Sequence, residues 1–78
     1  MELIISKPEE RVREIIEWMS CQTTDGHITI QEGHAPFVAL LEPQSELIVG
    51  RDAERTETIK LPHGYLVVTQ KQILIIVA

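Results

Sequence analysis

Three histidines are the first residues in this sequence that could bind a metal ion. They are His27, His34 and His63, and each one stands next to a glycine. A metal site needs several His, Cys or carboxylate ligands that converge on one point, and no two of these histidines are close in sequence. Histidines beside glycines are typical of solvated turns, so this interpretation is favoured over a metal site built from the three.

The possible nucleophiles lack the neighbours that would activate them. Ser6, Ser20 and Ser45 have no Gly-x-Ser-x-Gly context, and the acidic residues are scattered over segments typical of a solvated surface. Cys21 is the only cysteine, which excludes an internal disulfide, and its apolar segment indicates a small buried residue. The four glycines are spread singly, so no phosphate-binding loop is predicted. We therefore expect a protein that is not an enzyme.

Length and composition exclude several classes of protein and of partner. The 78 residues have room for one hydrophobic core. The formal net charge of −5 repels phosphate backbones and the basic residues form no stripe, so we expect no binding to nucleic acid. The longest apolar run, Ile73 to Ala78, is far shorter than the roughly 20 residues of a membrane-spanning helix. The start of the chain lacks the basic leader of a signal peptide, so a soluble intracellular protein is predicted.

Short apolar segments rich in β-branched residues alternate with turn residues about every ten positions, which predicts an all-β sandwich or barrel. The expected strands are Leu3–Ile5, His27–Gln31, Phe37–Leu41, Leu47–Val49, Thr56–Leu61, Tyr65–Val68 and Ile73–Val77. The last of these is apolar on both faces. It should therefore be covered on both sides or paired with another strand.

The segment from Glu9 to Met19 also fits a helix. Four of its apolar residues have the i, i+3, i+4, i+7 spacing of one helical face. They are Val12, Ile15, Ile16 and Met19. On this spacing alone, the segment is predicted to be helical.

One continuous string is more specific than these patterns. From Gly26 to Val38 it reads Gly-His-Ile-Thr-Ile-Gln-Glu-Gly-His-Ala-Pro-Phe-Val. It resembles the signature of the epsilon subunit of F-type ATP synthases, which is called delta in mitochondria. The similarity continues in order through Leu3–Ser6, Ile16–Ser20, Leu41–Pro43, His63–Val68 and Ile73–Val77. Gln44 and His63 depart from the family pattern, because each stands where the family usually has Gly.

The resemblance implies an all-β fold, a small antiparallel β-sandwich that forms one domain over residues 1–78. In that fold Arg11–Val12 and Ile15–Gln22 are strands, and this expectation replaces the helical one. The resemblance also implies a non-catalytic subunit of the central stalk that needs no cofactor. Such a subunit binds gamma and the c-ring, couples rotation to ATP synthesis, and lies in the cytoplasm at the membrane periphery.

The same resemblance suggests which residues bind the partners. Ser6, His34 and Ala39 are expected on the side that faces gamma, and Gly26 and His27 near gamma and the ring loops. The turn of Glu32, Gly33, His34, Ala35 and Pro36 is expected in that second region. Pro36 fixes its own φ and Gly33 permits an unusual backbone, so the turn either presents His34 to a partner or only shapes the loop.

Epsilon subunits usually continue into a C-terminal helical hairpin that inhibits ATP hydrolysis and in some members binds ATP. Because the sequence ends at Ala78, neither ATP binding nor this inhibition is expected. Two other hypotheses stay open. The chain could be a free-standing β-sandwich that binds a different partner, or a small metal protein or enzyme built on the three histidines.

Overall fold

The short apolar segments form nine strands in the computed structural model, which describes residues 1–77. The strands are β1 (Glu2–Ser6), β2 (Arg11–Ile15), β3 (Trp18–Thr23), β4 (Gly26–Gln31), β5 (Phe37–Leu40), β6 (Glu46–Gly50), β7 (Thr56–Lys60), β8 (Tyr65–Val68) and β9 (Gln72–Ile76). No helix occurs in the described range. The strands predicted from His27 onwards are therefore confirmed, with small shifts at their ends.

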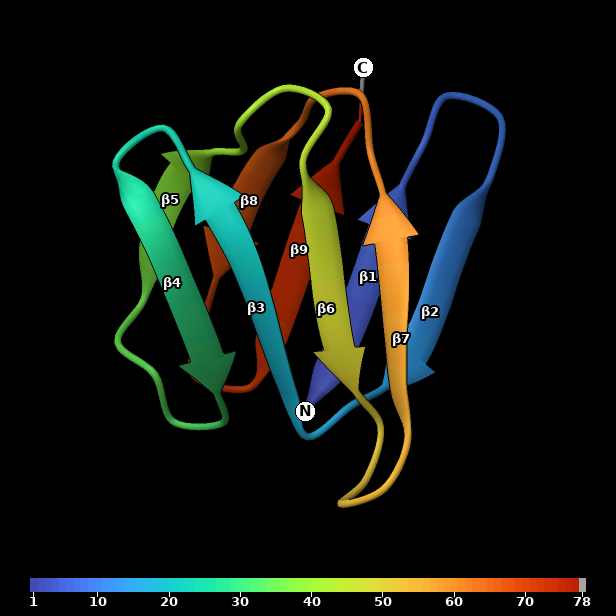
Figure 1. Cartoon of the computed structure of the whole chain (residues 1–78), viewed down its shortest axis with the longest axis vertical. Coiled ribbons are helices and arrows are strands. Elements are labelled where there is room, and N and C mark those ends of the chain that lie inside the picture. Colours follow the sequence, from blue (N-terminus) through green and yellow to red (C-terminus); the bar gives the residue numbers. More distant parts are fainter. Residues whose placement is uncertain (78) are drawn as a thin grey trace.

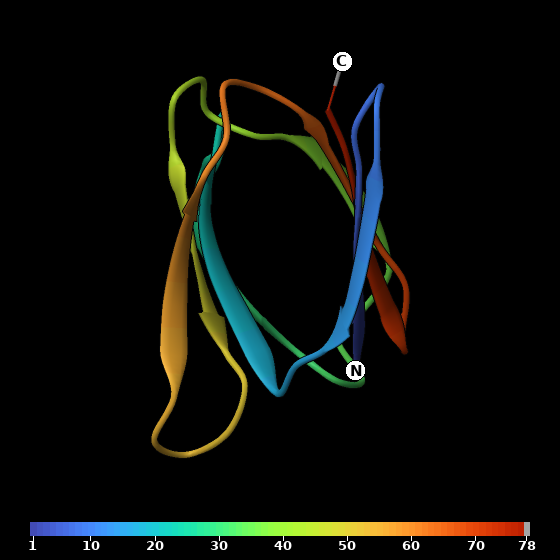
Figure 2. The same cartoon turned by 90° about the vertical axis from the view of Figure 1, so that its right-hand side faces the viewer.

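Two sheets pack face to face, as the edge-on view in Figure 2 shows. One has five strands in the order β2-β1-β9-β8-β5, and the other has four in the order β4-β3-β6-β7 (Figure 1). The predicted β-sandwich is confirmed. One pair departs from the antiparallel pattern, because β1 and β9 run parallel with Leu3 opposite Ile73 and Ile5 opposite Ile75. The direction of β9 is set by its hairpin with β8.

Strand β9 lies between β1 and β8, so hydrogen bonds are made along both of its edges. This position confirms the prediction that the doubly apolar segment from Ile73 to Val77 is paired. Its inward side chains Ile73 and Ile75 are fully buried, whereas Ile76 on the outer face is 41% exposed.

The segment from Glu9 to Met19 contains strands and not a helix. Val12 and Ile15 are 37% and 71% exposed, whereas Ile16 and Met19 are buried. The four residues therefore do not share one buried face, although their spacing would allow it. Burial between two sheets decides the conformation here, and the local periodicity does not.

The chain changes sheets between Ile15 and Trp18. The Ile16 amide donates to the carbonyl oxygen of Met1 beside the five-stranded sheet, and the Glu17 amide donates to that of Gly50 in β6, both at 2.8 Å. The expected strand bounds Arg11–Val12 and Ile15–Gln22 are therefore wrong in detail. β2 continues to Ile15, and β3 begins only after the corner.

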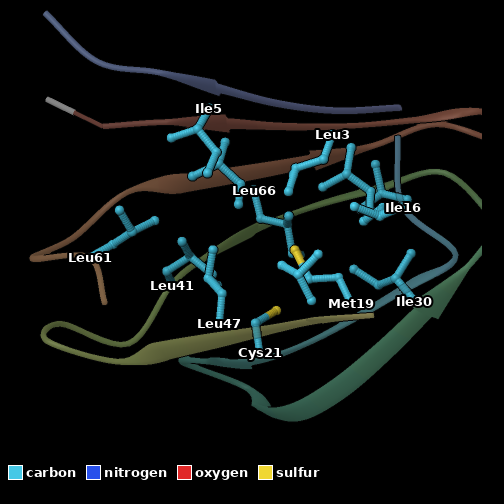
Figure 3. Close-up of a cluster of buried hydrophobic side chains, with 14 of the residues drawn as sticks. Leu3, Ile5, Ile16, Met19, Cys21, Ile30, Leu41, Leu47, Leu61 and Leu66 are labelled. Carbon is cyan, nitrogen blue, oxygen red and sulfur yellow. The ribbon is translucent and has the colours of Figure 1, made fainter. Parts of the chain in front are cut away.

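The core fills the space between the two sheets, and Figure 3 shows its side chains pointing toward one another from both layers. Its buried members are aliphatic apart from Met19 and Cys21. They are Leu3, Ile5, Ile16, Met19, Cys21, Ile30, Leu41, Leu47, Val49, Leu61, Leu66, Val68, Ile73, Ile75 and Val77. Removing aliphatic area from water at roughly 25 cal/mol per Å² is the main term that stabilises such a small domain.

Polar contacts tie the two open sides of the sandwich. On one side Arg51, in the β6–β7 hairpin, bonds both Glu14 of β2 and Glu57 of β7. These hydrogen bonds, first to Glu57 and then to Glu14, raise the pKa of the Arg51 guanidinium. On the other side the Thr24 amide donates to the carbonyl oxygen of Leu40 at 3.0 Å. A turn or hairpin loop of the four-stranded sheet is thus linked to an edge strand of the five-stranded sheet at each margin.

Gln44 adopts a backbone conformation that favours glycine. Its φ is +59°, and it is the only non-glycine residue of the described range with a positive φ. The family that the sequence resembles usually has Gly at this position, directly after Pro43. The side chain of Gln44 therefore imposes strain that glycine would avoid.

Replacing Gln44 by Gly is expected to stabilise the fold. Relief of the left-handed strain, less the extra entropy of glycine in the unfolded chain, should add about 0.5–1 kcal/mol to the free energy of unfolding. Urea titration of wild-type protein, Gln44→Gly and Gln44→Ala would measure it. Gln44→Ala keeps the Cβ and should show no gain, and an equal gain in both variants would contradict the explanation.

Candidate interaction surfaces

The outer face of the five-stranded sheet carries an apolar surface. Leu3 and Ile5 of β1 point into the core, so Ile4 and Ser6 point outward, and the strand register extends this face across the sheet. We call the outward apolar residues of this sheet the apolar face. They are Ile4, Ile15, Val38, Leu40, Tyr65, Val67, Leu74 and Ile76, of which Ile4 is itself only 3% exposed.

Several members of the apolar face are open to solvent. Val38 is 69% exposed, Tyr65 52%, Leu40 48% and Ile76 41%. Leu40, Tyr65 and Ile76 lie side by side on β5, β8 and β9, because Tyr65 is the register partner of both of the others. Contiguous exposed apolar side chains make this face a candidate surface for binding another molecule.

The outer face of the four-stranded sheet is different in character. Ser20 of β3 and Thr29 of β4 are hydrogen-bonded through their hydroxyl groups at 2.8 Å. Trp18 lies against Gly50 of the neighbouring strand, where an added Cβ would be only 2.0 Å from the indole nitrogen. Ile48, which is 40% exposed, lies between Ser20 and Thr58 on this face, so its exposed aliphatic side chain has polar register partners on both sides.

The predicted turn from Glu32 to Pro36 is a surface loop with internal order. Gly33 has a φ of +88°, and its amide donates to the carbonyl oxygen of Gln70 at 2.9 Å. The His34 ring lies 5.2 Å from that of Phe37, tilted by 57°, and its Nδ1 is 2.8 Å from the carbonyl oxygen of Ala35. The loop is therefore fixed to the β8–β9 turn, while Glu32, Ala35 and Pro36 are exposed.

Gly26, His27 and Ala39 line one hollow between the edge strands β4 and β5. Gly26 begins β4 with a φ of +126°, whereas the Glu32–Pro36 turn follows the end of the same strand. The structure thus separates residues that were predicted to lie near the same partners. They occupy opposite ends of β4, as Figure 1 shows.

Ser6 lies elsewhere, on the outer side of β1 and in register with Ile76. Its side chain lies on the same outer side of the sheet as the apolar face. Sequence reasoning missed Val38, Leu40, Tyr65 and Ile76 as candidates. The signal was present, because a last strand that is apolar on both faces must expose one of them when the core takes the other.

The three histidines do not converge. His27 is in β4, His34 in the β4–β5 turn and His63 in the β7–β8 turn. Within residues 1–77, no group of three metal-ligand side chains lies close enough to hold an ion. The same range contains no helix with the length and apolarity to cross a membrane.

Cys21 is a core residue with an exposure of 1%, which confirms its interpretation as a buried hydrophobic side chain. Burial raises the pKa of its thiol from 9.0 to about 11. The thiol is therefore neutral at physiological pH and is not an activated nucleophile.

Comparison with known proteins defines the family. The family described as ATP synthase, Delta/Epsilon chain, beta-sandwich domain matches residues 1–78. The chain belongs to this family. The resemblance drawn from the Gly26–Val38 string is thereby confirmed, and a search of curated proteins finds no match.

Solved structures share the fold of this Delta/Epsilon domain. A chain in the cryo-EM structure of the Euglena gracilis mitochondrial ATP synthase, OSCP/F1/c-ring, has a TM-score of 0.86 and 19% identity, over 96% of this chain and 48% of that one. A chain of the Tetrahymena thermophila mitochondrial ATP synthase central stalk/c-ring has a TM-score of 0.80 and 15% identity, over 99% of this chain and 62% of that one. The domain thus spans about half to three-fifths of these relatives.

The raised pKa of Cys21 predicts a loss of stability in alkali. A pKa of 9.0 in the unfolded chain and about 11 in the folded one means that stability is fully present below pH 9 and falls as the pH rises toward 11. The total loss should be roughly 2–3 kcal/mol. Urea unfolding at several pH values should show this slope in the wild type and a shallower one in Cys21→Ala. Equal slopes would contradict it.

Proposed function

We propose that this chain is a non-catalytic central-stalk subunit of an F-type ATP synthase. It binds gamma and the c-ring and transmits rotation between the ring and the catalytic head. It is held at the membrane periphery, on the cytoplasmic side, through that complex. Membership of the Delta/Epsilon family supports this function, and the likeness to chains of two ATP synthase structures agrees with it in fold.

The observation that carries the proposal is the apolar face. Val38 and Tyr65 expose 69% and 52% of their surfaces in a domain whose stability margin is thin. A rotor subunit needs a permanent contact with the shaft it turns with, and permanent interfaces are more apolar than transient ones. We assign this face to gamma. Ser6 at its border fits the gamma-facing side suggested by the sequence.

The Glu32–Pro36 turn is assigned to the c-ring. It lies at one end of the sandwich and not on the apolar face, so one partner can occupy each surface. It exposes the carboxylate of Glu32 and no large apolar side chain, which suits contact with the polar loops of a ring. Gly26 and Ala39 belong to neither assigned surface, although the hollow that they line is also lined by Val38 of the apolar face. Their predicted contact would need gamma to extend around the β4–β5 edge.

Placing a charge on the apolar face should break the complex with gamma. Val38 is largely exposed, so Val38→Glu should fold normally, yet an unpaired carboxylate buried in the interface should weaken binding about thirtyfold or more. Co-purification and titration with the gamma subunit of the same organism would measure this. Thr58→Glu, on the edge strand of the polar sheet, is the matched control and should bind as wild type.

If the wild-type chain and gamma do not associate at all, the proposed central-stalk function is refuted. A free-standing interaction module then becomes the better hypothesis. Equal weakening by Val38→Glu and Thr58→Glu would place the interface elsewhere.

A photoreactive crosslinker attached at position 34 should form a covalent product with a c-ring subunit. Because Cys21 is buried, His34→Cys supplies an accessible thiol to which a photoreactive crosslinker can be attached. In the assembled synthase of the same organism, illumination should give a product with a c-ring subunit. His63→Cys is the control, because His63 is also in an exposed turn but at the opposite end of the sandwich (Figure 1). Equal products from both positions, or none from position 34, would refute the assignment.

A further inference from the structure

The β2 margin of the apolar face carries two arginines beside the exposed Ile15. Two of the rows of register partners on this face cross the whole sheet from β2 to β5. One row is Arg11, Ser6, Ile76, Tyr65 and Leu40, and the next is Arg13, Ile4, Leu74, Val67 and Val38. Each row therefore begins with an arginine on β2 and ends with an apolar residue on β5.

The two arginines differ in their partners. Arg13 lies 3.5 Å from the carboxylate of Glu2 on β1. In the adjoining turn Lys7 and Glu10 pair with each other at 3.7 Å. Arg11 is exposed, and within residues 1–77 no carboxylate forms an ion pair with it.

The chain has 12 acidic and seven basic residues, and Lys60 and Lys71 also form no ion pair among residues 1–77. Arg11 differs from these lysines in its place, because it is in register with Ser6 at the border of the apolar face. Arginine is enriched in protein interfaces, where its planar fork binds a carboxylate through two parallel hydrogen bonds. An apolar patch alone also allows a partner to bind in several registers, and one charge at its margin selects among them.

We infer that Arg11 pairs with an acidic side chain on gamma, beside the apolar strip that covers Ile76, Tyr65 and Leu40. The inference rests on the proposed binding of gamma to this face and adds the chemistry of the partner surface. That surface is apolar opposite β9, β8 and β5 and carries a carboxylate opposite the β2 margin. The ion pair fixes the direction in which gamma lies across the sheet.

Binding of gamma by Arg11 variants tests the pair. At low salt, Arg11→Gln should weaken the affinity about threefold, and Arg11→Glu, which sets like charges opposite each other, about tenfold or more. At high salt both differences should shrink, because screening weakens the lost interaction. Lys60→Glu is the matched control. It makes the same charge change at an exposed position on the outer side of β7, and it should bind as wild type at both salt concentrations.

Circular dichroism and thermal midpoints would verify that each variant is folded. Wild-type affinity in Arg11→Glu, together with lost affinity in Val38→Glu, would overturn the ion pair while leaving the gamma-binding face in place. Equal weakening by Arg11→Glu and Lys60→Glu would overturn it as well, because only overall charge would then matter. Absence of binding by the wild type would remove the proposed function and this inference together.

Discussion

The structure depends on the parallel pairing of the first strand with the last. β1 lies between β2 and β9, so the centre of the five-stranded sheet forms only when residues about seventy positions apart in sequence meet. Leu3, Ile5, Ile73 and Ile75 enter the core from these two strands. The same pairing turns Ile4, Leu74 and Ile76 outward. The buried core and the apolar face thus follow from a single register, since a shift by one residue would exchange them.

Much of the fold was predictable from local patterns, but the path of the chain between sheets was not. Alternation and turn residues indicated the strands from His27 onwards, and Cys21 was correctly expected to be buried. The segment around Val12, Ile15 and Ile16 was misleading, because its spacing fits a helix while its conformation is decided by the corner between the sheets. No local signal in those residues reports that the chain changes layers there.

Of the candidate sites, the turns could be found from the sequence and the apolar face could not. The Gly26–Val38 string identified the family and drew attention to its turns, which stand out through glycine, proline and histidine. The apolar face has no such signature, because Val38, Leu40 and Tyr65 become one surface only when β5 and β8 are paired. Candidate binding residues that are defined only by a shared exposed surface are therefore harder to find in a sequence than residues that shape a loop.

The unequal faces of the sandwich also affect how separate copies of the chain behave toward one another. Near neutral pH the formal charge of −5 makes them repel, which offsets the attraction between exposed side chains such as Val38 and Tyr65. In mild acid the carboxylates take up protons and this repulsion fades, while the area of exposed hydrocarbon stays the same. Colloidal stability is therefore lowest where the net charge vanishes, and the partner proposed for the apolar face would remove that weakness by covering it.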